Sequence, residues 1–235
     1  MKIEAWVPCM RPKQMIGVLE DIRLQSHKID RIIIVDNGED KLLNYIPYYT
    51  WEDEPSPSPR LQIRDYHANI GTNAVWNLGL RSKADFVMFF PDDMRFDYHF
   101  VKKAIHTFDD PNVAVVSAKI IPWEEQLPKG KEDAYRCGRC CGHGKAGVFM
   151  IRGSVAREMP LIPEEFFIFF GDDWIDFHVR LKMKKIWTEL RWSCARHDYG
   201  SGVSAYLKKT VLREERRHWY KYLEEHNEGR LPFRQ

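Results

Sequence analysis

The feature that most constrains the fold is the apolar run at 86–90, which ends at Pro91. Asp92 and Asp93 follow directly. An apolar run of this length is typical of a strand buried on both faces of a parallel sheet. The two carboxylates then lie at the carboxyl edge of the sheet, where open α/β folds bind ligands, and they suit Mg²⁺ or Mn²⁺ carrying a phosphate. Pro-Asp-Asp is equally good turn chemistry, so a plain turn is the alternative.

Strand and helix patterns alternate along the first half of the chain, which predicts βαβ units and a parallel sheet. Predicted strands cover 3–7, 31–35, 61–65 and 86–90, with helices at 13–26 and 72–81. Beyond them we predict helices at 98–108, 172–185 and 205–225 and strands at 113–120, 148–152 and 186–192. The stretches 45–59 and 122–147 are predicted as surface loops because they are rich in Pro, Gly and polar residues.

Composition excludes some classes of protein. With 235 residues, 44% of them hydrophobic, the chain can bury a core, and a net charge of +2 gives no general argument for a nucleic-acid or membrane partner. No apolar run approaches the ~20 residues of a membrane span and no leader is evident, so we expect no transmembrane segment and a cytoplasmic location. Five cysteines, an odd number, argue against a secreted disulfide framework.

Three short motifs stand where predicted strands end: Ile-Val-Asp-Asn-Gly at 34–38, Asn-Ile-Gly-Thr-Asn-Ala-Val-Trp-Asn-Leu-Gly-Leu at 69–80 and Phe-Pro-Asp-Asp-Met at 90–94. In this order and spacing the sequence resembles family 2 glycosyltransferases of the GT-A type, from residue 3 to about 204. The resemblance implies an α/β GT-A (Rossmann-like) fold with a mostly parallel central sheet, helices on both faces and a C-terminal helical extension. It also implies a nucleotide-sugar donor.

The resemblance assigns donor-binding residues to the early loops. Asp36 is placed to accept a hydrogen bond from a base imide N–H, although an Asx residue starting a turn explains it nearly as well. Gly71 would allow close backbone approach to the nucleotide. The other residues that the resemblance places at the donor are Pro8, Arg11, Asn69, Asn77 and Asp92.

At the central motif the family usually has Asp-x-Asp or Asn-x-Asp, whereas this chain has Pro91 at the first position. By resemblance Asp93 then carries a divalent cation, Mn²⁺ or Mg²⁺, and Asp92 contacts ribose or a metal-bound water. His197, in Arg-His-Asp-Tyr-Gly-Ser-Gly at 196–202, resembles the closing histidine segment and would complete the metal shell. A lone histidine is otherwise a surface or packed residue.

The catalytic base is expected in Phe-Phe-Gly-Asp-Asp-Trp-Ile-Asp at 169–176, which resembles the family's acidic motif. Carboxylates at a helix N-terminus also act as caps, which explains one of the pair. Asp173 is our choice for the base, and Asp172 is the alternative because the register is uncertain by one residue.

Two further segments carry open alternatives. Cys137, Cys140, Cys141 and His143 could bind zinc, but no second Cys-x-x-Cys pair follows, so we favour a Gly-rich loop with free thiols. The predicted helix at 205–225 mixes basic, acidic and aromatic residues. It is either a solvated helix with ion pairs or a contact for a polyanion.

The expected function is transfer of a sugar from a nucleoside diphosphate, most simply a UDP-sugar, to an acceptor hydroxyl with inversion. The acceptor could be a glycan, a protein, a small molecule or a hydroxylated nucleic-acid base. A nucleotidyltransferase and a catalytically inactive binding module remain alternatives. The expected organisation is a domain at 1–204, with a nucleotide-sugar-binding half at 1–95 and an acceptor-binding half at 96–204, then a charged extension at 205–235.

Overall fold

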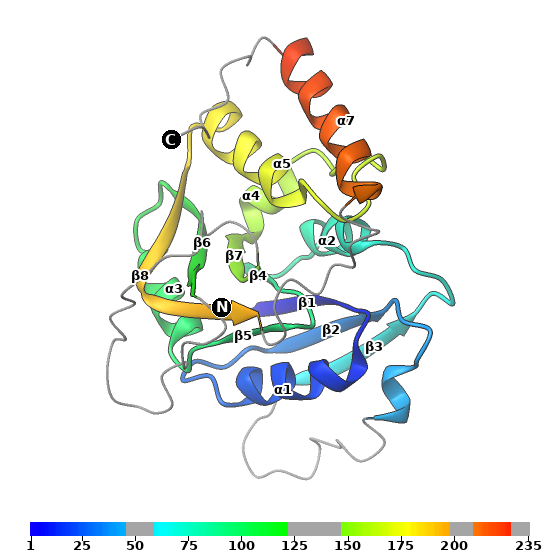
Figure 1. Cartoon of the computed structure of the whole chain (residues 1–235). Coiled ribbons are helices and arrows are strands. Elements are labelled where there is room, and N and C mark those ends of the chain that lie inside the picture. Colours follow the sequence, from blue (N-terminus) through cyan, green and yellow to red (C-terminus); the bar gives the residue numbers. More distant parts are fainter. Residues whose placement is uncertain (46–58, 122–146, 198–208, 227–235) are drawn as a thin grey trace.

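The computed structural model describes residues 1–45, 59–121, 147–197 and 209–226. Within them lies an eight-stranded sheet in the order β3-β2-β1-β4-β7-β6-β8-β5 (Figure 1). The strands are β1 (Ile3–Cys9), β2 (Arg31–Asp36), β3 (Arg60–Asp65), β4 (Phe86–Phe89), β5 (Met94–Phe96), β6 (Val113–Ile120), β7 (Phe149–Arg152) and β8 (Ile186–His197). The helices are α1 (Pro12–Arg23), α2 (Thr72–Leu80), α3 (Phe100–Thr107), α4 (Gly153–Glu158), α5 (Gly171–Phe177) and α7 (Val211–Glu225), with a 3₁₀ turn η1 (Leu42–Asn44) and a π-helical turn η3 (His178–Lys182).

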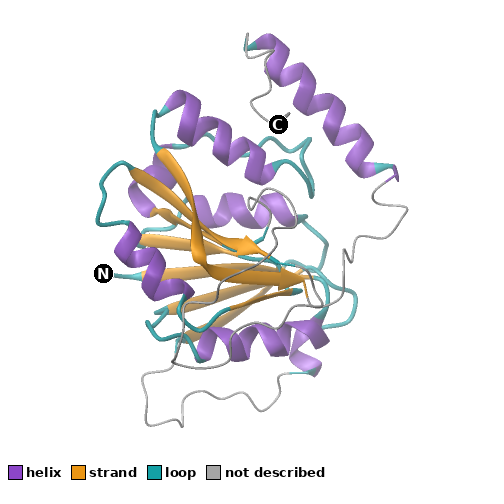
Figure 2. Cartoon of the chain, turned by 60° about the vertical axis from the view of Figure 1, so that its left-hand side comes forward, coloured by secondary structure: helices purple, strands orange, loops and turns teal. Residues whose placement is uncertain are grey.

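The sheet is buried on both faces, as the apolar runs predict. Along β2, Ile32 and Ile34 point into one core while Ile33 and Val35 point into the other, because successive side chains of a strand alternate. Helices α1 and α3 cover the first core, and α2, α4, α5 and α7 cover the second. Figure 2 shows the sheet between these two layers of helices. The predicted α/β fold with helices on both faces is confirmed.

Parallel pairing dominates the half of the sheet that carries the first motifs. β1 pairs in parallel with β2 and β4, and β2 with β3, while β6 and β8 are also parallel. The antiparallel pairings are β4 with β7, β7 with β6, and β8 with β5. A mostly parallel central sheet was predicted and is confirmed.

Two neighbouring strands diverge at their carboxyl ends. β1 pairs with β4 only from Ile3 to Trp6, while its pairing with β2 continues to Cys9. Pro8 lies in this last part of β1, where the absence of an N–H costs no hydrogen bond to β4. Because β2 and β4 flank β1 on opposite sides, this divergence lies at a point where strand order reverses, the place where α/β sheets bind ligands.

Several local predictions were wrong. β1 runs through Pro8 to Cys9, β8 extends to His197, and the predicted helix at 172–185 is the shorter α5 followed by η3. Helix α4 and strand β5 were not predicted at all. β5 is only three residues long and exists because it pairs with β8, about a hundred positions later, so its local sequence carries little signal.

Some expectations fall outside the described residues. They are the loop at 122–146 with its cysteine cluster, most of the loop at 45–59, and the proposed boundary at 204/205. No described helix combines the length and the apolar composition that a membrane span requires.

Candidate active site

An arginine and two aspartates meet where β1 and β4 diverge. Nη2 of Arg11 lies 2.8 Å from Oδ1 of Asp92 and 2.8 Å from Oδ2 of Asp93, so one guanidinium bridges both carboxylates. Both aspartates are almost completely buried, and the arginine side chain is 30% exposed. The sequence therefore placed Arg11, Asp92 and Asp93 correctly at one edge of the sheet, but it gave no sign that the arginine joins the acids.

Asp92, in the loop after β4, also binds the backbone of the loop after β1. Its Oδ2 accepts the backbone N–H groups of Met10 at 2.6 Å and Arg11 at 2.5 Å, while its Oδ1 accepts from Nε and Nη2 of Arg11 at 3.2 and 2.8 Å. Burial raises the pKa of Asp92 above its usual value, against the lowering effect of these bonds and of the Arg11 charge. The contact between Asp92 and ribose stays a prediction, and what the geometry gives is a link between the loop after β1 and the loop after β4.

Asp36, at the carboxyl end of β2, organises its own turn. Its two oxygens accept the backbone N–H groups of Gly38 at 3.3 Å and Leu42 at 2.9 Å, and its side chain is buried. These bonds match the turn-initiating alternative. Next to it, Oδ1 of Asn37 accepts the N–H of Ile70 at 3.4 Å, which links this turn to the loop before α2.

The loop with Asn69 and Gly71 is shaped by contacts within the protein. Asn69 accepts the N–H of Gly71 at 2.9 Å in an Asx turn. Gly71 has a φ of +82°, and a Cβ there would lie 2.5 Å from the carbonyl oxygen of Phe167. Glycine is therefore required here by close packing against Phe167, whatever the nucleotide requires.

Asn77, on α2, is bound to the chain that leads into α5. Its amide exchanges two hydrogen bonds, both 2.8 Å, with the backbone of Ile162. These residues border a cavity of about 310 Å³ between α2 and the chain at 162–167. The visible role of Asn77 is to fasten that chain to α2.

The pairing of β8 with β5 places the backbone of His197 near that of Asp93. This histidine is the last residue of β8 and lies opposite Met94 of β5, so its backbone is one position from Asp93 in the pairing. The described part of the chain contains no group of three or more His, Cys, Asp or Glu side chains placed to hold a metal ion. The side chain of His197 is outside the described atoms.

Asp172 and Asp173 lie in the first turn of α5 and are half-buried. The residue before this helix, Phe170, has a left-handed backbone with φ of +58°, which is uncommon for a bulky residue and marks a tightly constrained turn. A Cβ at Gly171 would lie 2.0 Å from Oδ1 of Asn73 on α2. The acidic start of α5 is thus pressed against the helix that follows the Asn69–Gly71 loop.

We call residues 162–170, which lead into α5, the strap. Asn73 binds the strap through its Nδ2, which donates to the carbonyl oxygens of Phe166 at 2.7 Å and Phe169 at 2.8 Å. From the other side, the carboxylate of Glu215 on α7 accepts three backbone N–H groups of the strap. The apolar run Phe166–Phe170 forms no strand, because these two side chains take its backbone hydrogen bonds.

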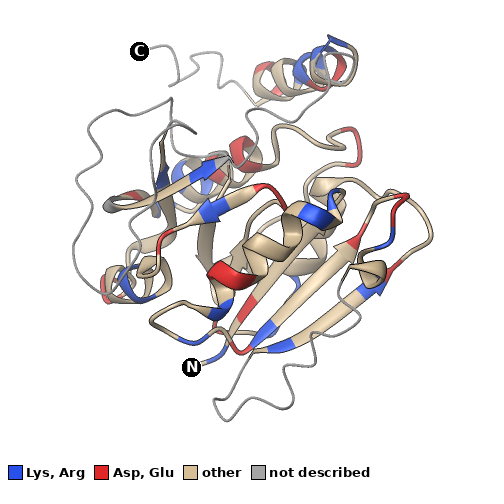
Figure 3. Ribbon diagram, turned by 60° about the horizontal axis from the view of Figure 1, so that its bottom comes forward, with Lys and Arg blue, Asp and Glu red and all other residues tan. Residues whose placement is uncertain are grey.

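Sequence reasoning missed Asn73 and Glu215. The signal for Glu215 was its spacing, since it lies four residues before Trp219 and eight before Leu223 on the apolar face of α7. The exposed faces of α7 carry both acidic and basic residues, and Figure 3 shows the two signs mixed along this helix. One ion pair there, Lys221 to Glu225 at 3.7 Å, fits the solvated-helix alternative.

No model of a known protein family matches the sequence, and no curated protein matches it. Solved structures do match. S. aureus TarS 1–349 in complex with UDP gives a TM-score of 0.63 at 16% identity, over 94% of this chain and 72% of that one. The mannosyltransferase PcManGT from Pyrobaculum calidifontis, in complex with GDP-Man and Mn²⁺, gives 0.69 at 13% identity, over 95% of this chain and 64% of that one. At this level of identity the likeness concerns the fold, and the chain has the GT-A-type fold that its motifs predicted.

Proposed function

We propose that this chain is a glycosyltransferase that moves a sugar from a nucleoside diphosphate, with UDP-sugars the first candidates, to an acceptor hydroxyl. The observation that carries the proposal is the Arg11–Asp92–Asp93 cluster at the diverging ends of β1 and β4. It occupies the ligand-binding edge of a fold shared with structures that hold UDP, UDP-GlcNAc or GDP-Man.

The donor would lie across the loops that the structure links. Its diphosphate would lie at the loops joined by Asp92, with Arg11 supplying a positive charge and Pro8 just before the first of these loops. The nucleobase of the donor would lie at the ends of β2 and β3, near Asn69 and Gly71. Asp36 keeps acceptor capacity for a base imide, because a carboxylate offers roughly four lone-pair sites and two are used by the turn.

A divalent cation fits the chemistry of this edge. Asp93 and His197 are the residues that would hold Mn²⁺ or Mg²⁺, since carboxylate oxygen is a preferred ligand type and His197 pairs with Met94, the residue that follows Asp93. The cation would stabilise negative charge on the departing diphosphate. Arg11 supplies positive charge at the same two carboxylates.

The chemical step requires a base on the acceptor side. Asp173, with Asp172 as the alternative, would take the proton of the acceptor hydroxyl as its oxygen attacks the anomeric carbon and the bond to the diphosphate breaks. A positioned base contributes about 10²- to 10⁴-fold to the rate. Direct attack from the face opposite the leaving group gives inversion.

The test is a donor screen followed by product analysis. UDP-sugars and GDP-sugars are first ranked by thermal shift with Mn²⁺ present, because a bound donor stabilises the folded chain. The best donor is then incubated with the protein and the released nucleotide is identified. Nucleoside diphosphate is the expected product. Formation of nucleoside triphosphate and sugar phosphate only when pyrophosphate is added would establish the nucleotidyltransferase alternative, and donor binding with neither product would support the inactive module.

A further inference from the structure

The strap is bound from two sides, by α2 through its carbonyl groups and by α7 through its N–H groups. Its carbonyl groups face α2, where the side chain and N–H of Asn73 bind them, the latter donating to Phe167 at 3.3 Å. Its N–H groups face α7. Oε1 of Glu215 accepts from Phe167 and Ile168, both at 3.1 Å, and Oε2 accepts from Phe169 at 2.7 Å.

Glu215 is buried, with 2% of its surface exposed, whereas its neighbour Glu214 is exposed. Burial raises the pKa of Glu215, while the three N–H groups lower it. A carboxylate withdrawn from water needs such donors, and hydrogen bonds to a charged acceptor are stronger than neutral ones. Any apolar residue at 215 would extend the apolar face of α7 and leave three strap N–H groups without this acceptor.

The strap runs directly into the start of α5, which carries Asp172 and Asp173. Phe169 is followed by the left-handed Phe170, then by Gly171, then by Asp172 and Asp173. The ring of Phe170 stacks on Trp219 of α7 with centroids 6.2 Å apart and an interplanar angle of 22°, which is a second link between this turn and α7. The direction in which α5 starts is therefore set by contacts to α7.

We infer that Glu215 is a positioning residue: from α7 it fixes the strap and thereby the acidic start of α5. For the reaction, this rests on the proposed function. The C-terminal helix is then part of the acceptor side of the site and not an appended segment. Loss of the carboxylate should move Asp172 and Asp173 while the Arg11–Asp92–Asp93 cluster, which is built from the loops after β1 and β4, stays in place.

The experiment compares Glu215→Ala, Glu215→Gln and the matched control Glu214→Ala in the full chain. Residue-resolved amide exchange by NMR reports on 167–169 and on 172–173, and calorimetry reports UDP affinity. In Glu215→Ala we expect about tenfold or faster exchange at the amides of 167–169, since one lost hydrogen bond of about 1.4 kcal/mol corresponds to tenfold. At 172–173, which Glu215 does not bind directly, we expect a smaller rise. We expect UDP affinity within about twofold of wild type and a fall in kcat of up to ~100-fold at an unchanged donor KM, as a displacement of about 1 Å can cause.

Glu215→Gln keeps one acceptor oxygen and replaces the other with an NH₂ group, which cannot accept. Amide exchange should therefore rise at only some of residues 167–169. The kcat of this variant should lie between those of wild type and Glu215→Ala. This variant also serves if Glu215→Ala does not fold. Glu214→Ala should match wild type in every readout.

Unchanged exchange at 167–169 and 172–173 in both Glu215 variants would overturn the inference, as would exchange that rises equally in Glu214→Ala. Altered exchange with unchanged kcat would overturn the link to catalysis. A wild-type chain that neither binds UDP nor turns over a donor would refute the proposed function, and the exchange data would still decide the structural role of Glu215.

Discussion

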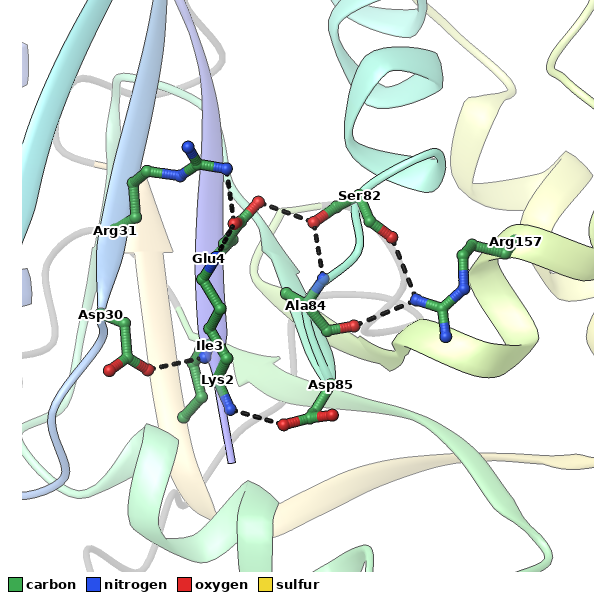
Figure 4. Close-up of polar contacts among 9 residues, drawn as sticks. All are labelled: Lys2, Ile3, Glu4, Asp30, Arg31, Ser82, Ala84, Asp85 and Arg157. Carbon is green, nitrogen blue, oxygen red and sulfur yellow. Dashed lines mark hydrogen bonds and ion pairs between the residues drawn. The ribbon is translucent and has the colours of Figure 1, made fainter.

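Two buried charged clusters stand at opposite ends of the same sheet. At the amino end of β1, the carboxylate of Glu4 accepts from Nη2 of Arg31 at 2.6 Å and from Oγ of Ser82 at 2.6 Å, and Lys2 lies 3.2 Å away (Figure 4). At the carboxyl end, Arg11 divides its guanidinium between Asp92 and Asp93. One carboxylate thus collects two cations at the amino end, whereas two carboxylates share one arginine at the carboxyl end.

The pKa values of Glu4 and Asp92, one from each cluster, shift in opposite directions. Burial alone would raise the pKa of Glu4, but the hydrogen bonds from Ser82 and Lys2 and the charge of Arg31 bring it below the usual value. At the carboxyl end, burial prevails and the pKa of Asp92 is raised. The amino-end cluster stabilises the ionised form of Glu4, while burial at the carboxyl end disfavours the ionised form of Asp92, and perturbed pKa values of this kind cluster at functional sites.

The largest effect is expected from Asp93→Asn. If the carboxyl-end cluster acts on the donor, this change should lower sugar transfer at least ~100-fold, because a neutral amide at 93 is a weaker ligand for the divalent cation that would stabilise the leaving diphosphate. The melting temperature should stay near wild type, since Arg11 keeps its bonds to Asp92. The measurement is steady-state release of nucleoside diphosphate, with and without excess EDTA.

Asp85→Asn is the matched control for that change. Asp85 belongs to the amino-end cluster, where it accepts the N–H of Lys2 at 2.7 Å, and it should leave transfer unaffected. Full activity of Asp93→Asn, or of the wild type in EDTA, would remove the functional half of the comparison.

Glu4→Ala should give the converse result. Breaking a buried ion pair costs about 3–5 kcal/mol, and the value here should fall at or just below the lower end because Arg31 reaches solvent. The free energy of unfolding from urea titration should therefore drop by ~2 to 3 kcal/mol, with kcat of the folded fraction unchanged. Glu20→Ala, an exposed glutamate on α1, is the control, and a Glu4 variant that lost activity without losing stability would reverse the assignment of the two clusters.

Asp36→Ala gives a smaller effect and separates two roles at the carboxyl edge. If Asp36 reads the base, the affinity for UDP should fall by ~1 to 3 kcal/mol, the cost of leaving a buried partner unsatisfied. If it serves only the turn, where it accepts from Gly38 and Leu42, stability should fall while the affinity of the folded protein is kept. Calorimetry with UDP beside urea unfolding distinguishes the two outcomes.

The two clusters were not equally predictable from the sequence. The apolar runs of β1, β2 and β4 and the polar residues after them are local signals, so the carboxyl-edge positions of Asp36, Asp92 and Asp93 could be predicted. The bridge from Arg11 to two carboxylates depends on the approach of segments about 80 residues apart, which no local pattern encodes. The cluster of Glu4 was not predicted, because two of its partners, Arg31 and Ser82, come from β2 and from the turn before β4.

The same reasoning explains the strap. Its apolar run has a strand-like composition, but its backbone is bound by the side chains of Asn73 and Glu215, which lie 46 to 96 positions away from their partners in the sequence. Local propensity yields to such contacts when they satisfy every polar backbone group. Only the spacing of Glu215 to Trp219 and Leu223 could have indicated a buried acid on α7.

The smallest predicted effect is on acid stability, and it follows from the sign of the Glu4 shift. Because the folded pKa lies below the usual 4.5, the unfolded chain binds more protons in the interval between the two values. The stabilisation by Glu4 is therefore present above pH 4.5 and is lost as the pH falls through the folded pKa. In Glu4→Gln, which cannot titrate, the free energy of unfolding should fall less steeply with acid, by at most about 1.4 kcal/mol per pH unit. Urea titrations of both proteins from about pH 6 to about pH 3 measure this difference. Identical slopes would mean that the amino-end cluster does not lower the pKa of Glu4, and the contrast with the raised pKa of Asp92 would then fail.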